Sequence, residues 1–166
     1  ELGLFFECSS LKDVKIPSSI IEIKPKAFYG CSSIENIIIP PNLKIIESDV
    51  FNKCSKLKNI EVPFSVTEIK SNAFTDCISL TSFNMPSSVL SIGIEIFKGC
   101  TSLTLVQLSN NLKFVTNRCF FHCTSLKEIK LPPSVISIGE NAFSECCSLK
   151  IIEMPKNCEY TFKYNV

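Results

Sequence analysis

The chain has 166 residues, of which 45% are hydrophobic and 20% charged, enough apolar material for one domain with a sizeable core. Its net charge of +1 provides neither the clustered Lys and Arg that bind nucleic acid nor the polybasic segment that an anionic membrane attracts. No apolar run approaches the roughly 20 residues that span a bilayer, so direct membrane insertion is not expected either.

The chain begins at Glu1, without an initiating Met, a basic stretch or a signal-peptide cleavage site. We therefore interpret it as a fragment or processed product of something longer.

Two residue types recur along the chain at a fixed interval of 23 residues. Cysteine recurs at Cys8, Cys31, Cys54, Cys77, Cys100, Cys123 and Cys146. Phenylalanine precedes each of these by three residues, at Phe5, Phe28, Phe51, Phe74, Phe97, Phe120 and Phe143. Such columns, in phase and without an insertion, indicate a repeat architecture.

The first element of each repeat is a short apolar segment with alternating character, which predicts a strand with one buried face. These segments are Leu11–Ile16, Ile34–Ile39, Leu57–Val62, Leu80–Met85, Leu103–Leu108, Leu126–Leu131 and Leu149–Met154. A proline follows all but one of them and ends the strand, since proline lacks the N–H for the next ladder bond.

The second element is a β-branched segment that predicts another short extended run on the opposite wall, as at Ile20–Ile23 and Val66–Ile69. A polar turn follows, and then the motif A-F-x-x-C. Phe and Cys three residues apart share one face of a helical or 3₁₀ turn, so we predict such a turn in each repeat.

One such unit cannot bury its own apolar face, whereas stacked units bury a continuous core. The sequence therefore predicts a solenoid of mostly short parallel β-strands with 3₁₀ or helical turns. Seven 23-residue repeats would form a curved, right-handed stack. We expect a single domain over residues 1–166, with repeats at about 4–157. Residues 158–166 would be an irregular end or a truncated next repeat, because Cys158 and Thr161 break the pattern.

The repeat is similar to that of the BspA-like, or type-5, leucine-rich repeat family. The segment Leu126–Leu149, which reads LKEIKLPPSVISIGENAFSECCSL, carries the resemblance most clearly. The resemblance implies a leucine-rich repeat solenoid without enzymatic activity or cofactor. It also implies adhesion to host matrix proteins or other cells, since members are found on bacterial and protist surfaces. Ser109 departs from the pattern by replacing the proline of one repeat.

The column cysteines are expected to be small buried hydrophobes beside phenylalanine rather than disulfides or zinc ligands. In-register neighbours would lie about 4.8 Å apart with parallel Cβ vectors, and zinc needs converging ligands. Cys119 occupies the column of Ala27, Ala73 and Ala142 and is predicted to lie in the core, whereas Cys147 occupies a Ser/Thr column and is predicted to be more exposed.

The residues that usually carry chemistry are sparse. His122 is the single histidine, and we expect it to be solvated, with no carboxylate orienting it. Five glycines do not form a phosphate-binding loop. We therefore predict no catalytic residue, no metal site and no cofactor.

We place binding on the outward-facing residues of the first strands, which would form a concave ribbon. The predicted contacts are Asn36, Ile38, Asn59, Glu61, Ser82, Asn84, Leu105, Gln107, Glu128 and Lys130. Tyr29, Phe64 and Phe121 fall in columns that are otherwise mostly polar and are predicted to be exposed aromatic contacts. Apolar residues within polar surroundings favour a protein or peptide partner.

Two functions stay open at this point. The family resemblance favours a surface-displayed adhesion module within a larger protein. Free cysteines and the missing signal peptide favour the cytoplasm, where the chain would be a scaffold or regulatory subunit that docks a signalling enzyme such as a phosphatase. Exposed apolar ends of the stack would in addition permit end-to-end self-association.

Overall fold

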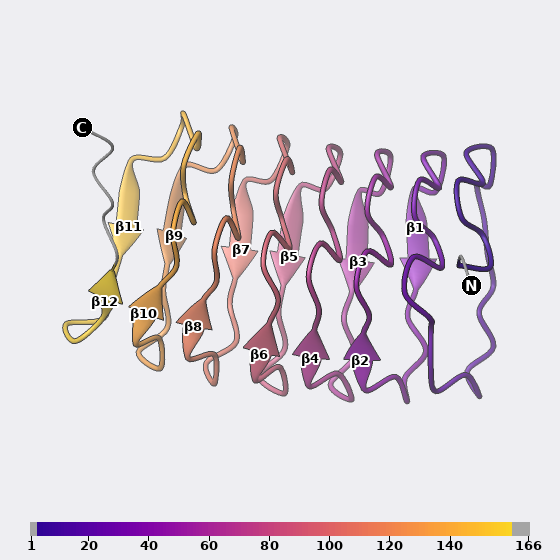
Figure 1. Cartoon of the computed structure of the whole chain (residues 1–166), viewed down its shortest axis with the longest axis horizontal. Coiled ribbons are helices and arrows are strands. Elements are labelled where there is room, and N and C mark those ends of the chain that lie inside the picture. The colour runs from indigo at the N-terminus through magenta and orange to yellow at the C-terminus, as the bar shows by residue number, and fades with distance from the viewer. Residues whose placement is uncertain (1–2, 161–166) are drawn as a thin grey trace.

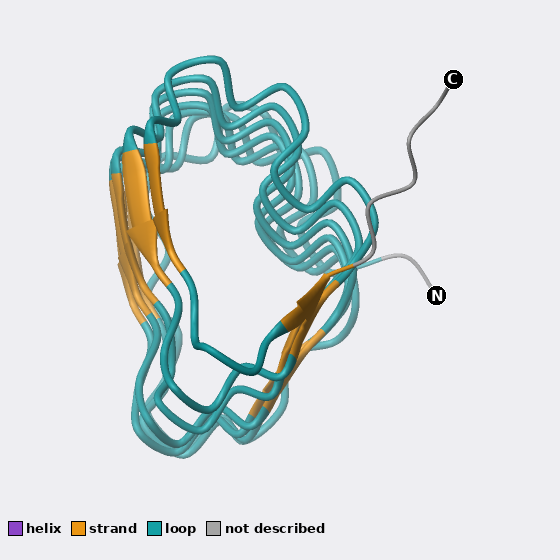
Figure 2. Cartoon of the chain, turned by 90° about the vertical axis from the view of Figure 1, so that its left-hand side faces the viewer, coloured by secondary structure: helices purple, strands orange, loops and turns teal. Residues whose placement is uncertain are grey.

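The computed structural model describes residues 3–160, which wind into a row of similar coils along one axis (Figure 1). Viewed along that axis, each strand-bearing coil places two short strands on different walls, joined by turns (Figure 2). The coils repeat every 23 residues, which confirms the predicted solenoid of short parallel strands.

The first wall, which we call the long-strand wall, consists of three-residue strands. They are β1 (Asn36–Ile38), β3 (Asn59–Glu61), β5 (Ser82–Asn84), β7 (Leu105–Gln107), β9 (Glu128–Lys130) and β11 (Ile151–Glu153). The second wall, the short-strand wall, consists of two-residue strands. They are β2 (Ile45–Ile46), β4 (Glu68–Ile69), β6 (Ser91–Ile92), β8 (Phe114–Val115), β10 (Ser137–Ile138) and β12 (Glu159–Tyr160).

Pairing along both walls is parallel and in register. Asn36 of β1 faces Asn59 of β3, and Ser82 of β5 faces Leu105 of β7, each one repeat further along the chain. Because strand side chains alternate between faces, the central residue of β1, β3, β5, β7 and β9 is buried and its two neighbours are exposed. The predicted inward column therefore forms the core side of this wall.

The turn that carries Phe and Cys closes single bonds between residues three apart, as a 3₁₀ turn does, but within residues 3–160 it does not continue into a helix. Alternate N–H groups donate to the following coil instead of to their own turn: Phe28 N donates to Val50 O at 3.0 Å, and Gly30 N donates to Asn52 O at 2.8 Å. Only the intervening groups close local turns, as in Cys31 N to Phe28 O at 3.1 Å. The turn segment is thus a third ladder between coils.

Left-handed residues on either side of the phenylalanine cause this geometry, with φ between 53° and 73°. The first column of such residues is Lys26, Asp49, Asn72, Glu95, Arg118 and Asn141. The second is Glu7, Gly30, Lys53, Asp76, Gly99, His122 and Glu145. A left-handed residue interrupts a right-handed helix and costs roughly 1–2 kcal/mol when it is not glycine. The bonds between coils offset that cost.

The phenylalanine column forms a continuous stack of rings through the core. Consecutive rings lie 5.3–5.8 Å apart between centroids and within 16° of parallel. The four central rings, Phe51, Phe74, Phe97 and Phe120, are fully buried. Offset stacking at this spacing suits aromatic pairs, so the ring column is a principal source of packing energy.

The cysteine column is buried from Cys31 to Cys146, as predicted, and it makes a contact that the sequence does not reveal. Each of these thiols donates to the carbonyl of the phenylalanine one coil earlier, for example Cys77 Sγ to Phe51 O at 3.2 Å. Burial raises the pKa of the Cys31 thiol to about 11 and that of the Cys54 thiol to about 12. A protonated thiol is the form that can donate this bond.

The first repeat departs from the prediction in two ways. Within residues 3–160, its segments Leu11–Ile16 and Ile20–Ile23 are not paired as strands, and Cys8 is exposed rather than buried. This coil contacts a neighbour on one side only, through turn bonds such as Phe5 N to Ala27 O at 2.9 Å. At the other end, β12 pairs with β10, and residues 161–166 lie outside the described part.

Candidate functional site

The outward face of the long-strand wall brings together the ten residues predicted to bind a partner. All of them are exposed, two on each of β1, β3, β5, β7 and β9: Asn36, Ile38, Asn59, Glu61, Ser82, Asn84, Leu105, Gln107, Glu128 and Lys130. The strands that carry them lie side by side along the axis of the coils (Figure 1), and parallel pairing holds the residues of β1 in register with those of β3, and those of β5 with those of β7. Their role in binding stays a prediction.

Two large apolar side chains project from the β1–β3 end of this wall. Phe64, in the turn after β3, is 78% exposed, and Ile38 of β1 is 83% exposed. Both belong to the lining of one groove of about 530 Å³, and Phe64 also lines a second groove of about 480 Å³ on the β5 side. The sequence predicted the exposure of Phe64, and the structure adds the grooves on both sides of it.

The other two predicted aromatic contacts are half-buried, which corrects the prediction that they are exposed. Tyr29 stacks on Phe6 with ring centroids 5.0 Å apart, and the ammonium of Lys53 lies 5.2 Å from the Tyr29 ring centroid. Tyr29 and Phe121 both belong to the turn segment rather than to the long-strand wall. Neighbouring coils cover them there, so they do not extend the Phe64 surface.

Two ion pairs join neighbouring coils beside the long-strand wall. Lys58 Nζ lies 2.8 Å from Glu35 Oε2, and Lys130 Nζ lies 3.0 Å from Glu153 Oε2. The hydrogen bond from Lys58 lowers the pKa of Glu35. Glu61 differs, because no cation or hydrogen-bond donor within residues 3–160 contacts its carboxylate.

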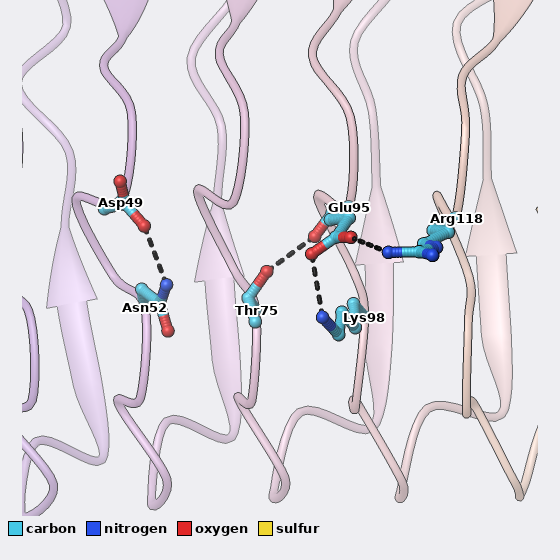
Figure 3. A network of polar contacts seen from close by, with 6 residues as sticks. All are labelled: Asp49, Asn52, Thr75, Glu95, Lys98 and Arg118. Atoms are coloured by element: carbon cyan, nitrogen blue, oxygen red, sulfur yellow. Dashed lines mark hydrogen bonds and ion pairs between the residues drawn. The ribbon is translucent and has the colours of Figure 1, made fainter.

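The turn segment carries a polar network that ties three coils together (Figure 3). The carboxylate of Glu95 accepts from Lys98 Nζ at 2.9 Å and from Arg118 Nη1 at 3.1 Å, while Thr75 Oγ1 donates to the Glu95 carbonyl at 2.6 Å. The hydrogen bond from Lys98 is the main cause of a lowered Glu95 pKa. Because each of its groups already has a partner, we assign this network to stability.

The single histidine has a carboxylate partner, so the prediction that it has none is wrong. Glu145 Oε2 lies 2.9 Å from His122 Nδ1. The two residues are 23 positions apart, and a search at the repeat interval would have found the pair. Both side chains are about half exposed. Within residues 3–160, no group of three or more His, Cys, Asp or Glu side chains is arranged to hold a metal ion.

The remaining cysteines lie where the columns place them. Cys119 is buried in the core and Cys147 is exposed, both as predicted, and Cys158 is partly exposed. All ten cysteines are free thiols. In the described part of the chain, no helix has the length and apolar character needed to cross a membrane.

Known proteins share this architecture. The BspA type leucine-rich repeat region matches residues 2–104 and 90–165, in six copies. A leucine-rich repeat protein from Bacteroides ovatus is 35% identical, with a TM-score of 0.93 over 96% of this chain and 42% of that one. A T. pallidum leucine-rich repeat protein is 32% identical, with a TM-score of 0.84 over 87% of this chain and 71% of that one.

A leucine-rich repeat protein from Eubacterium ventriosum, 21% identical, shares the fold alone, with a TM-score of 0.63 over 75% of this chain and 34% of that one. No curated protein is significantly similar in sequence. The chain spans less than half the length of the Bacteroides ovatus protein. Its repeat interval, its strand walls and its phenylalanine column agree with the family match, and the chain belongs to the BspA-type leucine-rich repeat family.

Proposed function

We propose that this chain is a non-catalytic protein-binding module that recognises a protein partner through the long-strand wall, as part of a larger surface protein. The observation that supports the proposal is the contrast between the two sides of this wall. The central residues of β1, β3, β5, β7 and β9 are buried and uniformly apolar, whereas the outward ones vary from amide to carboxylate to aliphatic. A constant scaffold with a variable, solvent-facing array suits recognition.

Chemistry and charge agree with a protein partner. Leu105 and Ile38 are apolar side chains among amides and hydroxyls, which is the composition of a protein contact surface. Paired charges and a net charge of +1 do not form the basic surface that nucleic acid or anionic lipid requires.

A second candidate is an intracellular scaffold that docks a signalling enzyme. Ten free thiols favour this alternative, because secreted proteins generally oxidise or avoid exposed thiols such as Cys147. The same wall would serve as the docking surface in either compartment.

A binding experiment with matched variants tests the proposal. The immobilised chain is exposed to a panel of purified extracellular-matrix proteins and to a total cell extract, and bound proteins are identified by mass spectrometry. We expect capture to be lost when Asn59, Asn84 and Leu105 are all replaced by lysine. The control places three lysines on the short-strand side instead, at the exposed positions Thr67, Leu90 and Ile136.

The outcomes separate the alternatives. Capture of a matrix protein supports adhesion, whereas capture from the cell extract supports the scaffold. If the long-strand variant captures the same partners as the control, the assignment of binding to this wall is wrong.

End-to-end association is a further prediction for this chain. Ile152 and Met154 occupy inward columns but are exposed at β11, so they offer apolar surface to a second copy. Sedimentation velocity over a concentration series should show association that Ile152→Lys and Met154→Lys together abolish. A monomer at all concentrations would refute it.

A further inference from the structure

Phe64 occupies a distinctive place on the long-strand wall. Its ring is 78% exposed and forms the shared side of the two grooves, of about 530 Å³ and 480 Å³. Ile38, the last residue of β1, lines the first groove together with Phe64. An exposed ring beside an exposed aliphatic side chain is the kind of anchor that buries substantial area when a partner side chain inserts next to it.

Side-chain amides surround this apolar pair. Asn36 and Asn59 face each other across β1 and β3, and Asn84 lies on β5 in the second groove. Each amide carries both donors and an acceptor, as a peptide group does. They can therefore pair with the backbone of a polypeptide that lies across the strands.

The charge in the grooves indicates which side chains of a partner would fit them. Glu61 is the one titratable residue that lines either groove, and both grooves include it. It lies between Ile38 and Asn84, and no cation in residues 3–160 contacts its carboxylate. The nearby Glu35 and Lys58 pair with one another at 2.8 Å, so Glu61 is the carboxylate that remains without a partner in the groove linings.

We propose that the residues around Phe64 bind an extended polypeptide segment of a partner protein in which an apolar side chain lies next to arginine or lysine. We call this set the Phe64 site: Asn36, Ile38, Asn59, Glu61, Phe64 and Asn84. The apolar side chain packs against Phe64 and Ile38, and the basic group pairs with the unpartnered Glu61. The inference rests on the proposed function and specifies the partner's chemistry within the same wall.

The observations favour a polypeptide over a glycan or a second copy of the chain. The aliphatic side chain of Ile38 beside the Phe64 ring suits an apolar side chain, and the unpartnered Glu61 carboxylate suits a basic group, a combination that a polypeptide provides and a neutral glycan does not. In a second copy that pairs the same site with itself, two uncompensated Glu61 carboxylates would approach each other, which opposes association.

Capped nine-residue peptides probe the site directly. The test peptide carries phenylalanine next to arginine in a glycine–serine background. Three companions replace the arginine by serine, the arginine by glutamate, or the phenylalanine by serine. Binding is followed by amide NMR at low salt, because salt screens exposed ion pairs. We expect shifts at the Phe64 site, with the arginine peptide at least about threefold tighter than the glutamate peptide.

Three variants measure what Phe64 and Glu61 each contribute to peptide binding, with Phe114 as the control. Phe64→Ala should weaken the arginine peptide by about tenfold or more. Glu61→Gln should retain binding but remove the preference for arginine over glutamate. Phe114→Ala, which truncates a partly exposed ring on the short-strand wall, should leave every affinity unchanged. The NMR spectrum of each variant also reports whether it is folded.

The proposal is overturned if Phe64→Ala binds like the wild type, if the glutamate and arginine peptides bind equally, or if no peptide shifts the site at about 1 mM. Shifts at Phe64 with maltohexaose or chitohexaose but with no peptide would assign the site to glycans instead. Concentration-dependent dimerisation that Phe64→Ala abolishes would assign it to a second copy.

The capture experiment separates this inference from the proposed function. If the three-lysine variant loses its partner while Phe64→Ala keeps it, the wall binds proteins but the Phe64 site is not the anchor. If neither variant loses the partner, the assignment of binding to this wall fails as well.

Discussion

Replacing Phe74 with alanine removes a ring from the middle of the phenylalanine stack. Phe74 is fully buried, and its centroid lies 5.6 Å from Phe51 and 5.8 Å from Phe97. Phe83, on β5, tilts against it at 5.1 Å. Truncating a core phenylalanine to alanine costs about 3–5 kcal/mol. The coils fix the ring spacing, so the cavity cannot collapse easily and we expect the upper half of that range.

Such a loss is a large part of the roughly 5–15 kcal/mol that stabilises a domain. Because the chain contains no tryptophan, urea unfolding is best followed by far-UV circular dichroism. Phe114→Ala is the matched control, since it removes the same atoms from a ring that is 52% exposed. We expect the control to lose much less than the Phe74 variant.

Equal losses of unfolding free energy in the two variants, or a loss below about 1.5 kcal/mol for Phe74→Ala, would refute the argument that the ring stack carries the core. Phe74→Leu tests the cavity explanation, because leucine refills much of the space. It should recover a substantial share of the lost stability.

Three further predictions concern the turn segment and the thiols. Gly99→Ala should cost about 1–2 kcal/mol in urea unfolding, because Gly99 has φ of 73°. Lys53→Ala, in the same left-handed column, should cost less, because a residue with a side chain already occupies that position and the substitution adds no backbone strain. Equal losses in the two variants would refute the strain argument. Burial raises the pKa of Cys31 to about 11 and of Cys54 to about 12, from 9.0. In the unfolded chain these thiols therefore lose their protons at a lower pH than in the folded chain. The free energy of unfolding should accordingly fall as the pH rises above about 9, by about 1.4 kcal/mol per pH unit for each thiol. Cys54→Ala should reduce that slope under reducing conditions, and a pH-independent stability would contradict it. At neutral pH a thiol reagent should modify the exposed Cys147 rapidly and Cys54 only after unfolding; equal rates would exclude the buried column.

The periodicity of the sequence was sufficient to predict the coil, the two strand walls and the inward columns. In a stack of this kind each residue contacts the residue 23 positions away, so a pattern along the chain is also a pattern in space. The buried phenylalanine and cysteine columns follow directly from it. Ser109, which replaces the proline of one repeat, is still accommodated in the stack, since it is buried and its hydroxyl donates to Val89 O at 2.6 Å.

The left-handed turns could not be predicted from residue type. Glycine usually marks such positions, but here Lys53, Glu95, Arg118 and His122 also adopt positive φ. The backbone accepts this conformation because N–H groups of the turn bond to the next coil, and those bonds exist only in the stacked structure. The pairing of His122 with Glu145, by contrast, follows the 23-residue interval.

The sequence by itself determined which side chains enter the core, because apolar groups recur at positions that must leave water together. Only the tertiary structure decided how much surface each outward side chain keeps, because that depends on the neighbouring coil. Tyr29 is covered by Phe6 and Lys53, whereas Phe64 keeps both of its faces beside open grooves. Two aromatic residues that look alike in the sequence thus differ in exposure, because side chains of adjacent coils cover one of them and not the other.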